Sequence, residues 1–424
     1  MRLALFVMLL ASGAAYAGGA EPSPRDDDQF DVMNALARRH LHDLEDETWN
    51  AYGQVTFIDS IKLPFHAPYS GTHSLSPDLE NSFTATATVF AGVRLWQGGE
   101  LYIAPEAVSE QPLSSLHGLG GVIQNFELQK GGTPAPVGYI GRLYFQQTIE
   151  LGGGPETIAS NPLALGKTIQ HDRITFTVGR FSVLDFLDKN TYSGDLRRQF
   201  FNMAFMTYAP YDFPADTRGY TVGANVEVVV GDWSFRASRA APPKQPNQTD
   251  LEYRFWKYYG DAIEIEHDHE LAGYHGAVRV LAFRNHENMG KFTDATDAYV
   301  ADPSKNAAEC GDLFHYDSTD QNAPDLCWAR KPNDKVGIGI NIEQAVSSDI
   351  GVFLRAMIAD GRTEVYSFTP TDRSISLGAL ALGKGWGRPD DYAGVGFGAG
   401  GISDEHATYL RLGGIDGFIG DGKL

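Results

Sequence analysis

The stretch Phe83-Thr84-Ala85-Thr86-Ala87-Thr88-Val89-Phe90-Ala91-Gly92-Val93-Arg94-Leu95-Trp96 repeats its chemistry every second residue. The odd-numbered positions are all apolar, and the even-numbered positions carry the polar groups, namely three threonines and Arg94. A period of two is that of a β-strand, in which neighbouring side chains point to opposite faces. Strands of globular proteins usually have about five or six residues, whereas strands that cross a membrane need about 9–11. The length of this stretch therefore predicts a membrane-spanning strand.

The same alternation recurs along the chain, at residues 139–150, 220–230, 274–284, 336–343 and 350–358. Each of these stretches is bounded by Gly, Pro, Asp or Asn, which favour turns. A series of strands with one polar and one apolar face fits two architectures. In a β-sandwich the polar face meets bulk water, and in a barrel it lines a filled lumen. The sequence thus predicts an all-β fold and leaves these two architectures to be separated.

Two further features favour an antiparallel transmembrane β-barrel. Aromatic residues gather near the predicted strand ends, as an interfacial girdle requires: Tyr52, Trp96, Tyr102, Tyr139, Trp233, Phe235, Tyr392 and Tyr409. The polar faces carry isolated arginines, which a wide lumen can hydrate and a packed core cannot: Arg94, Arg142, Arg236, Arg279 and Arg355. In such a barrel we expect one apolar set to face outward: Val89, Val93, Leu143, Phe145, Val226, Val228, Ile338 and Ile340.

The start of the chain indicates export. Residues 1–17 combine Arg2, a short apolar run and a small-residue site that ends at Ala17, which together are typical of a signal peptide. Residues 18–48 follow as a periplasmic leader, in which Val32, Leu36, Leu41 and Leu44 recur at helical spacing. A short amphipathic helix and a disordered remnant are both compatible with this leader. We assign residues 49–424 to the barrel.

Composition narrows the partners. The 424 residues carry a formal net charge of −20, and no basic stripe is present, which argues against nucleic acid. After the signal peptide no apolar stretch is long enough for a spanning helix, so membrane insertion would require a barrel. Cys310 and Cys327 are the only cysteines, and export favours a disulfide between them in an extracellular loop. We expect no metal and no cofactor, because neither cysteine has zinc-ligand spacing to another Cys or His.

Residues 179–204 interrupt the alternation after a predicted strand. This segment mixes carboxylates, carboxamides, arginines and aromatic rings. Such groups bind sugars, because hydroxyls need fixed donors and acceptors and the C–H face of a sugar ring packs on an aromatic ring. An ordinary exposed loop is the alternative. For Asp185 and Asp188 the alternative to sugar contact is an ion pair or a turn cap that holds the loop.

Several stretches resemble the carbohydrate-selective porins of Gram-negative outer membranes (OprB type). The resemblance is carried by 179–204 together with 52–56, 69–75, 92–96, 105–106, 335–344, 360–364 and 385–389. It implies a barrel of about 16 strands, narrowed by inward-folded loops, that passes monosaccharides such as glucose. The matching positions are Arg180, Asp185, Asp188, Asn190, Asp195, Arg197 and Asn202 in the segment, with Arg94, Trp96 and Glu106 on the wall. Arg142 and Arg355 complete the predicted pore lining by strand parity.

Two positions depart from this pattern. Arg180 shares parity with Ile174, Phe176 and Val178, so alternation alone would aim it at lipid. We expect either the strand to end before Arg180 or a bulge to turn it inward. The resemblance also implies that the family continues past residues 416–424, so we expect the C-terminal strands to be missing from this sequence.

A rival interpretation is a secreted or periplasmic β-rich protein that binds or hydrolyses sugars. Asp185 with Asp188, or Glu264 with Glu266, would then supply acid and base. No nucleophile motif such as GxSxG supports an enzyme. His267 and His269 suggest an acidic loop at a strand end more than a metal site. The expected partners are small sugars and outer-membrane lipid, and both a monomer and a homo-oligomer are compatible with the sequence.

Overall fold

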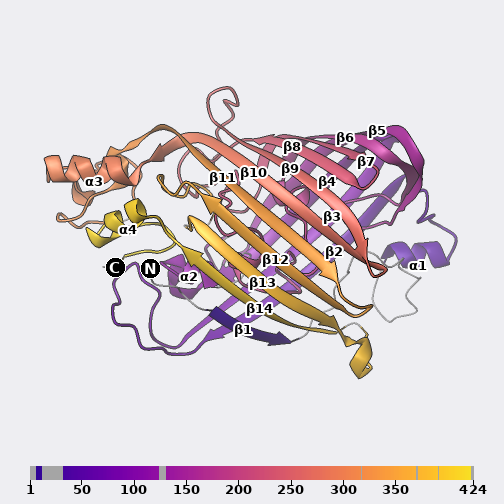
Figure 1. Ribbon diagram of the computed structural model, residues 1–424, viewed down its shortest axis with the longest axis horizontal. Helices are drawn as coiled ribbons and strands as arrows, with labels where there is room; N and C mark the ends of the chain where they lie inside the picture. The colour runs from indigo at the N-terminus through magenta and orange to yellow at the C-terminus, as the bar shows by residue number, and fades with distance from the viewer. Residues whose placement is uncertain are drawn as a thin grey trace.

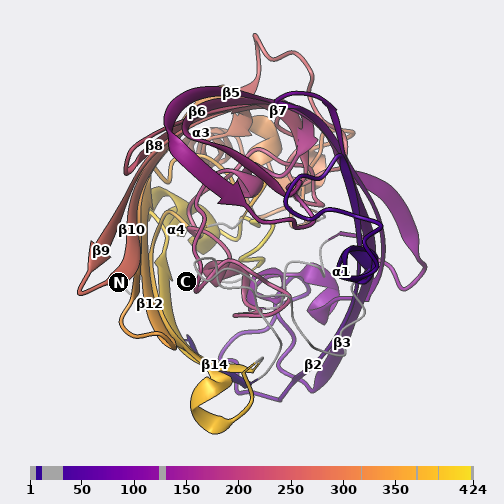
Figure 2. The same cartoon turned by 90° about the vertical axis from the view of Figure 1, so that its right-hand side faces the viewer.

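The computed structural model describes residues 6–11, 32–123, 130–316, 318–368, 371–389 and 391–421. In these residues fourteen antiparallel strands form one sheet in the order β1-β14-β13-β12-β11-β10-β9-β8-β7-β6-β5-β4-β3-β2. From β2 to β14 every strand therefore pairs with its neighbours in sequence. The sheet curls around a central space that other segments occupy (Figures 1 and 2). This arrangement confirms the predicted all-β antiparallel fold.

The strands are β1 (Phe6–Ala11), β2 (Trp49–Lys62), β3 (Glu80–Trp96), β4 (Gly99–Gln111), β5 (Val137–Ile158), β6 (Lys167–Phe181), β7 (Thr221–Val230), β8 (Trp233–Ala240), β9 (Tyr259–Leu271), β10 (Tyr274–Gly290), β11 (Arg330–Ala345), β12 (Ile350–Ala359), β13 (Arg373–Leu382) and β14 (Tyr392–Gly401). The helices are α1 (Val32–Arg38), α2 (Gly120–Ile123), α3 (Phe292–Ala301) and α4 (Asp404–Arg411). Short 3-10 turns are η1 (Leu113–Leu116), η3 (Val183–Asp185), η4 (Met203–Phe205), η5 (Ala307–Glu309), η6 (Leu326–Trp328) and η7 (Gly383–Trp386). None of the described helices is long and apolar enough to cross a bilayer.

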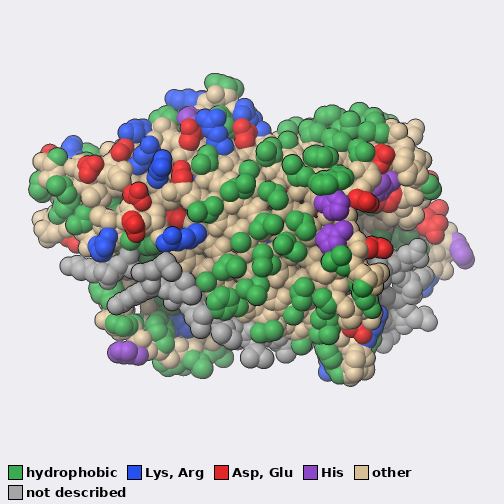
Figure 3. Space-filling view, viewed as in Figure 1, with side chains coloured by type: hydrophobic (Ala, Val, Ile, Leu, Met, Phe, Trp, Pro, Cys, Tyr) green, Lys and Arg blue, Asp and Glu red, His purple; other side chains and the backbone are tan. Residues whose placement is uncertain are grey.

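The two faces of the sheet separate as the alternation predicts. On β3 the threonines at 84, 86 and 88 are buried on the inner face, and Val89 is 56% exposed on the outer face. Val93, Leu143 and Ile338 are also exposed. Phe145, Val226, Val228 and Ile340, the other residues predicted to face outward, are half-buried. Apolar side chains cover much of the outer surface over β9–β14 (Figure 3). This surface is an apolar band of the kind that outer-membrane barrels present to lipid.

The edges of the sheet are β1 and β2, which do not pair with each other in the described residues. The count of about 16 strands therefore stays a prediction. Most of the predicted signal peptide lies outside the described residues, except that Phe6–Ala11 form β1 and pair with β14. The predicted leader contains α1, whose Met33 sulfur accepts a hydrogen bond from Ala51 N at 3.4 Å on β2. Cleavage of the signal peptide stays a prediction as well.

The two ends of the barrel differ in loop length. Two-residue turns join β3 to β4, β7 to β8 and β9 to β10. Each of these turns contains a glycine with positive φ, as tight hairpins favour. The φ values are 75° at Gly98, 53° at Gly231 and 81° at Gly273. Long connections, including 182–220, 241–258 and 291–329, lie at the opposite end. Since outer-membrane barrels place short turns in the periplasm, the long-loop end is the extracellular end.

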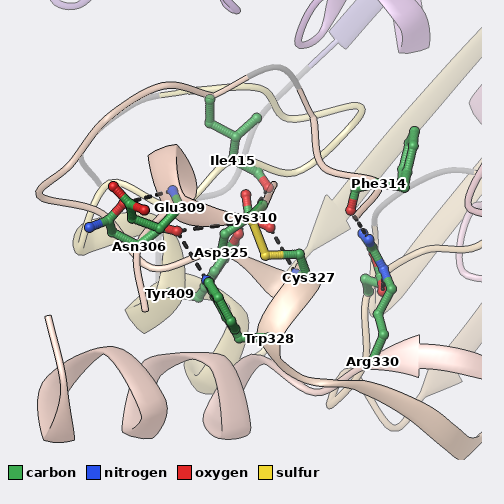
Figure 4. Close-up of a disulfide and its surroundings, with 11 residues drawn as sticks. Asn306, Glu309, Cys310, Phe314, Asp325, Cys327, Trp328, Arg330, Tyr409 and Ile415 are labelled. Carbon is green, nitrogen blue, oxygen red and sulfur yellow. Dashed lines mark hydrogen bonds and ion pairs between the residues drawn. A yellow bond between two sulfur atoms is a disulfide. The ribbon is translucent and has the colours of Figure 1, made fainter. Parts of the chain in front are cut away.

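The extracellular end carries the predicted disulfide between Cys310 and Cys327, which is confirmed (Figure 4). The cysteines are 17 residues apart in sequence, and their Cα atoms lie 6.2 Å apart. Around the bond, Asp325 accepts from Cys327 N at 2.8 Å, and Trp328 donates from its ring nitrogen to Asn306 O at 3.0 Å. Among the described residues, Cys310, Cys327 and Asp325 form the only group whose ligand atoms lie close enough together to hold a metal ion. The two sulfur atoms of this group are bonded to each other in the disulfide.

We predict that the double variant C310S/C327S loosens the 291–329 loop without opening the barrel. The bond closes this loop alone, and loop entropy gives it a stabilising effect of about 3 kcal/mol. Limited proteolysis in detergent should cleave this loop about tenfold faster or more than in the oxidised parent. The heat-modifiable gel mobility of the barrel serves as control and should not change. Equal cleavage rates would show that packing alone holds the loop.

Candidate functional site: a segment folded into the lumen

The chain leaves the barrel wall at the end of β6. Gly179, two residues before that end, has a φ of 138°, and a Cβ placed there would lie 2.4 Å from Leu143 O, so only glycine fits. After Phe181 the segment 179–204 turns inward and crosses the space enclosed by the sheet (Figure 2). Its apolar side chains form a buried core with residues of the following loop and of the wall: Val183, Leu187, Leu196 and Met203 with Tyr208, Tyr211, Phe283 and Met357. Hydrophobic burial thus holds this segment inside the barrel.

The strongest polar anchor of the segment is the pair Asp188 and Arg355. Arg355 lies on β12, is 1% exposed, and donates from Nε to Asp188 Oδ1 at 3.0 Å. The same guanidinium donates to the main-chain oxygens of Asp188, Ser193 and Phe205. Asn341 of β11 also donates to Asp188 Oδ1, at 2.6 Å. Every guanidinium nitrogen of Arg355 therefore binds the segment or the residue that follows it, which fixes this end of the segment to the β11–β12 wall.

A second anchor joins the segment to β5. Arg142 donates from Nε and one terminal nitrogen to the two oxygens of Asp185, at 2.8 and 2.6 Å. Asp185 Oδ2 also accepts from Ser182 N at 3.1 Å and completes a capping box at η3. Asp185 thus acts as ion-pair partner and turn cap, which is the structural alternative that the sequence left open.

The third anchor reaches the wall on the other side of the barrel (Figure 2). Arg197 donates to Gln54 Oε1 of β2 at 3.1 Å and to Glu106 Oε2 of β4 at 3.2 Å. Glu106 is buried, and it also accepts from Lys130 Nζ at 2.9 Å and from Thr88 at 2.7 Å. Because β2 and β4 are far from β12 in the sheet order, the segment bridges distant parts of the wall.

The remaining predicted residues of the segment shape its turns. Asn190 donates to Asn341 Oδ1 at 2.7 Å and accepts from the main-chain nitrogens of Tyr192 and Ser193. Asn202 caps η4 by accepting from Ala204 N at 2.8 Å. Asp195 accepts from Arg197 N at 2.9 Å, and its side chain is 42% exposed. Of these three, Asp195 is the one that stays open to solvent.

Arg180 has a different position from the one expected. β6 continues through Phe181 and no register shift occurs at Arg180, so neither expected alternative holds. Arg180 pairs with Leu143, and the residues of β5 that precede Leu143 have no partner on β6. The guanidinium fills this break in the wall, donating to Ile140 O at 2.8 Å and to Asp216 at 2.5 Å. It therefore supplies the hydrogen bond that a strand neighbour would otherwise make to this carbonyl.

Two predicted wall residues lie away from the segment. Arg94 lies six residues further along β3 than Thr88, a distance of about 20 Å, and its terminal nitrogen donates to Asp46 of the leader at 2.6 Å. Trp96 follows a register shift between β3 and β4 and is exposed. Its ring lies 5.5 Å from that of Phe145 on the outer face. Arg94 is thus a periplasmic-end residue, and Trp96 belongs to the outer aromatic girdle.

Sequence reasoning missed a second loop inside the barrel. Asp212 accepts from the main-chain nitrogens of Tyr366, Ser367 and Phe368 at 2.7–2.9 Å, and Lys335 of β11 lies 3.3 Å from it. No sequence pattern marks a carboxylate that binds a distant loop backbone. Arg236 and Arg279 face inward as expected, but they are buried and paired and are not isolated arginines hydrated by a wide lumen. Their partners form a wall network that sequence reasoning did not predict: Glu227, Glu264, Glu266 and Glu343.

The carboxylates proposed for hydrolysis are engaged in ion pairs. Glu264 lies 2.9 Å from Arg236, and Glu266 lies 2.9 Å from Arg279 and also contacts Arg236. Asp185 and Asp188 are bound by arginines as described above. All four carboxylates thus serve as ion-pair partners that hold the wall and the segment in place.

Comparison with known proteins identifies a family and solved structures that resemble this chain. The family described as carbohydrate-selective porin, OprB family, matches residues 73–423. The structure of OprB from Pseudomonas putida shares 13% identity, with 85% of this chain and 78% of that chain covered and a TM-score of 0.57. OccK9 (OpdG) from Pseudomonas aeruginosa shares 12% identity over 84% of this chain and 83% of that chain, with a TM-score of 0.40. Among curated proteins no match was found.

Proposed function

The chain belongs to the OprB family of carbohydrate-selective porins, and we propose that residues 179–204 form the constriction through which it passes monosaccharides such as glucose. The protein is a channel of the Gram-negative outer membrane for selective diffusion of sugars. It is thus a transport protein rather than an enzyme. The observation that carries the proposal is the bridge that this segment makes between β4 and β12 inside the barrel.

The chemistry of the segment supports passage of neutral solutes. Its buried charges are matched in pairs, Arg142 with Asp185, Arg355 with Asp188 and Arg197 with Glu106, so they hold a fixed geometry without a large net charge. Polar groups near the passage offer donors and acceptors in set positions, as sugar hydroxyls require. Lys189 is exposed on the segment, and Asp195 and Arg198 are about 40% exposed. These three side chains are the most exposed charged groups of the segment.

Arg197→Ala and Arg180→Ala form a matched pair of tests, because both remove an arginine that binds a buried carboxylate. The Arg197 side chain joins the segment to the wall at β2 and β4, so its loss should widen the passage and shift ion selectivity toward cations. If the lost group also donates to sugar, glucose block should weaken by roughly ten- to a hundred-fold, from about 1.5–3 kcal/mol per charged hydrogen bond. Arg180 lies in the wall, so its loss should lower thermal stability by about 3 kcal/mol and leave glucose block unchanged.

Single-channel recording in planar bilayers measures both variants beside the parent. The parent should show ohmic conductance that a monosaccharide reduces, whereas an enzyme or a closed adhesive barrel would show none. If R197A kept parental selectivity and glucose block, the segment would be an ordinary loop. If R180A weakened glucose block as strongly as R197A, Arg180 would line the passage and would not be a purely structural residue of the wall.

A further inference from the structure

The loop between β8 and β9, residues 241–258, projects sideways from the extracellular end of the barrel (Figures 1 and 2). Its tip exposes two large aromatic side chains, Trp256 at 80% and Tyr253 at 56%. Arg254 and Lys257 beside them are also exposed. Lys257 lies 5.1 Å from the Tyr258 ring and has no ion-pair partner in the described residues. The tip thus combines exposed aromatic rings with exposed cations, away from the lumen.

Below this tip the outer face of β8–β11 carries a row of exposed ion pairs. Arg239 is bidentate to Asp261 at 2.7 and 2.6 Å. Arg284 approaches the two oxygens of Asp334 at 3.2 and 3.3 Å. Blue and red side chains cluster around an apolar tip at this place on the surface (Figure 3). We refer to Arg239, Tyr253, Arg254, Trp256, Lys257 and Arg284 as the lateral patch.

The height of the lateral patch follows from the strand that carries Arg284. On β10 the outward residue Val280 is exposed and belongs to the apolar band, together with Ile263 and Ile338 on the adjacent strands. Arg284 is four residues further toward the extracellular end, about 14 Å along the strand. The patch therefore begins where the apolar band ends, at the level of the headgroups of the outer leaflet.

The chemistry of the lateral patch fits phosphate. The patch holds four cations, and three of them pair with carboxylates: Arg239 with Asp261, Arg284 with Asp334 and Arg254 with Glu252. This excess of cations stands out in a chain whose total charge is −20. Exposed ion pairs contribute only about 0–1 kcal/mol, so an arginine can exchange a carboxylate for another anion at little cost. The planar guanidinium binds phosphate in the same bidentate manner, and Trp and Tyr favour the interface between acyl chains and headgroups.

From these observations we infer that the lateral patch binds the phosphate groups of lipopolysaccharide in the outer leaflet. Arg239, Arg284 and Lys257 contact the lipid A phosphates, and Trp256 inserts at the boundary between headgroup and acyl chains. The interaction is separate from sugar passage, because no residue of the patch contacts the segment 179–204. It orients the barrel in the membrane and holds a lipid at one defined side.

The test compares a triple variant, R239Q/R284Q/K257Q, with the parent. Bound lipid is counted by native mass spectrometry while the detergent-solubilised protein is titrated with bisphosphorylated lipid A. The parent should bind lipid A with an affinity about tenfold higher or more than the triple variant. R388Q removes another exposed arginine, paired with Asp391 at the periplasmic end, and should bind like the parent.

Two further arms identify the ligand. Lipid A without phosphates should bind the parent as weakly as the triple variant binds lipid A. Inorganic phosphate at millimolar concentration should not displace lipid A, because it lacks the acyl chains that Trp256 meets. Equal binding of lipid A by parent and triple variant would overturn the inference, and so would equal binding of both lipid forms by the parent. Glucose block of the triple variant should remain parental and shows that the barrel is folded.

Discussion

Replacing Arg355 by Ala should raise single-channel conductance well above that of the parent and abolish glucose block. Arg355 of β12 binds the side chain of Asp188 and three main-chain oxygens, those of Asp188 and Ser193 in the segment and that of Phe205 just after it. Its loss leaves Asp188 buried without its cation, at a cost of about 3–5 kcal/mol. The segment can escape this cost by leaving the wall, which lets Asp188 reach water and widens the lumen. Planar-bilayer recording measures both effects.

Two companion variants separate loss of anchoring from loss of folding. R355M/D188N removes both buried charges, and Asn tolerates the φ of 54° at position 188 and keeps an amide oxygen for Asn341. This variant should recover part of the stability but still lack the ties to Ser193 and Phe205. Arg373→Ala removes an exposed arginine at the start of the neighbouring strand β13 and should change neither conductance nor block. If R355A conducted like the parent and kept glucose block, Arg355 would not hold the constriction.

Strand parity predicted the inner and outer faces well, because a period of two is set by backbone geometry alone. Arg142 and Arg355 therefore point inward, as the alternation of their neighbours indicated. Strand parity does not indicate where along the barrel axis a residue lies. Arg94 shares the inner face with Thr88 but pairs with the leader residue Asp46. Pore-lining residues could thus be assigned to a face from sequence but not to a level.

Local irregularities explain the other differences. A register shift beside Trp96 places its ring on the outer face, and bulges leave no reliable signal in a single sequence. Arg180 lies where β6 leaves the wall, so its partners Ile140 and Asp216 come from segments with no sequence proximity to it. The segment 179–204 was recognised because it breaks the alternation. Its anchors were not predictable, because they depend on which wall each turn meets.

The extracellular end should lose stability as the pH rises from about 6.5 to about 9, because of His406 on α4. This ring lies 3.5 Å from Asp372 and 3.3 Å from Asp416, and it stacks on Phe292 at 4.1 Å between centroids. Burial alone would lower the pKa of His406, but the two carboxylates outweigh burial and raise it to about 9. Because the pKa of His406 is higher in the folded chain than in the unfolded chain, its charged form stabilises the folded state. This stabilisation is complete below about pH 6.5 and is lost as the pH rises through about 9.

A pKa of about 9 in the folded chain, against about 6.5 in the unfolded chain, corresponds to about 3 kcal/mol of stability for the packing of α4 on α3. Hydrogen exchange of residues 404–411 at pH 6 and pH 10 should therefore show protection that falls with rising pH. His406→Gln should exchange fast at both values, because it leaves Asp372 and Asp416 buried without a cation. His66→Gln changes an exposed histidine in the connection between β2 and β3 and should keep the parental pH dependence. If the protection of α4 were equal at the two pH values in the parent, the charged form of His406 would not hold this end together.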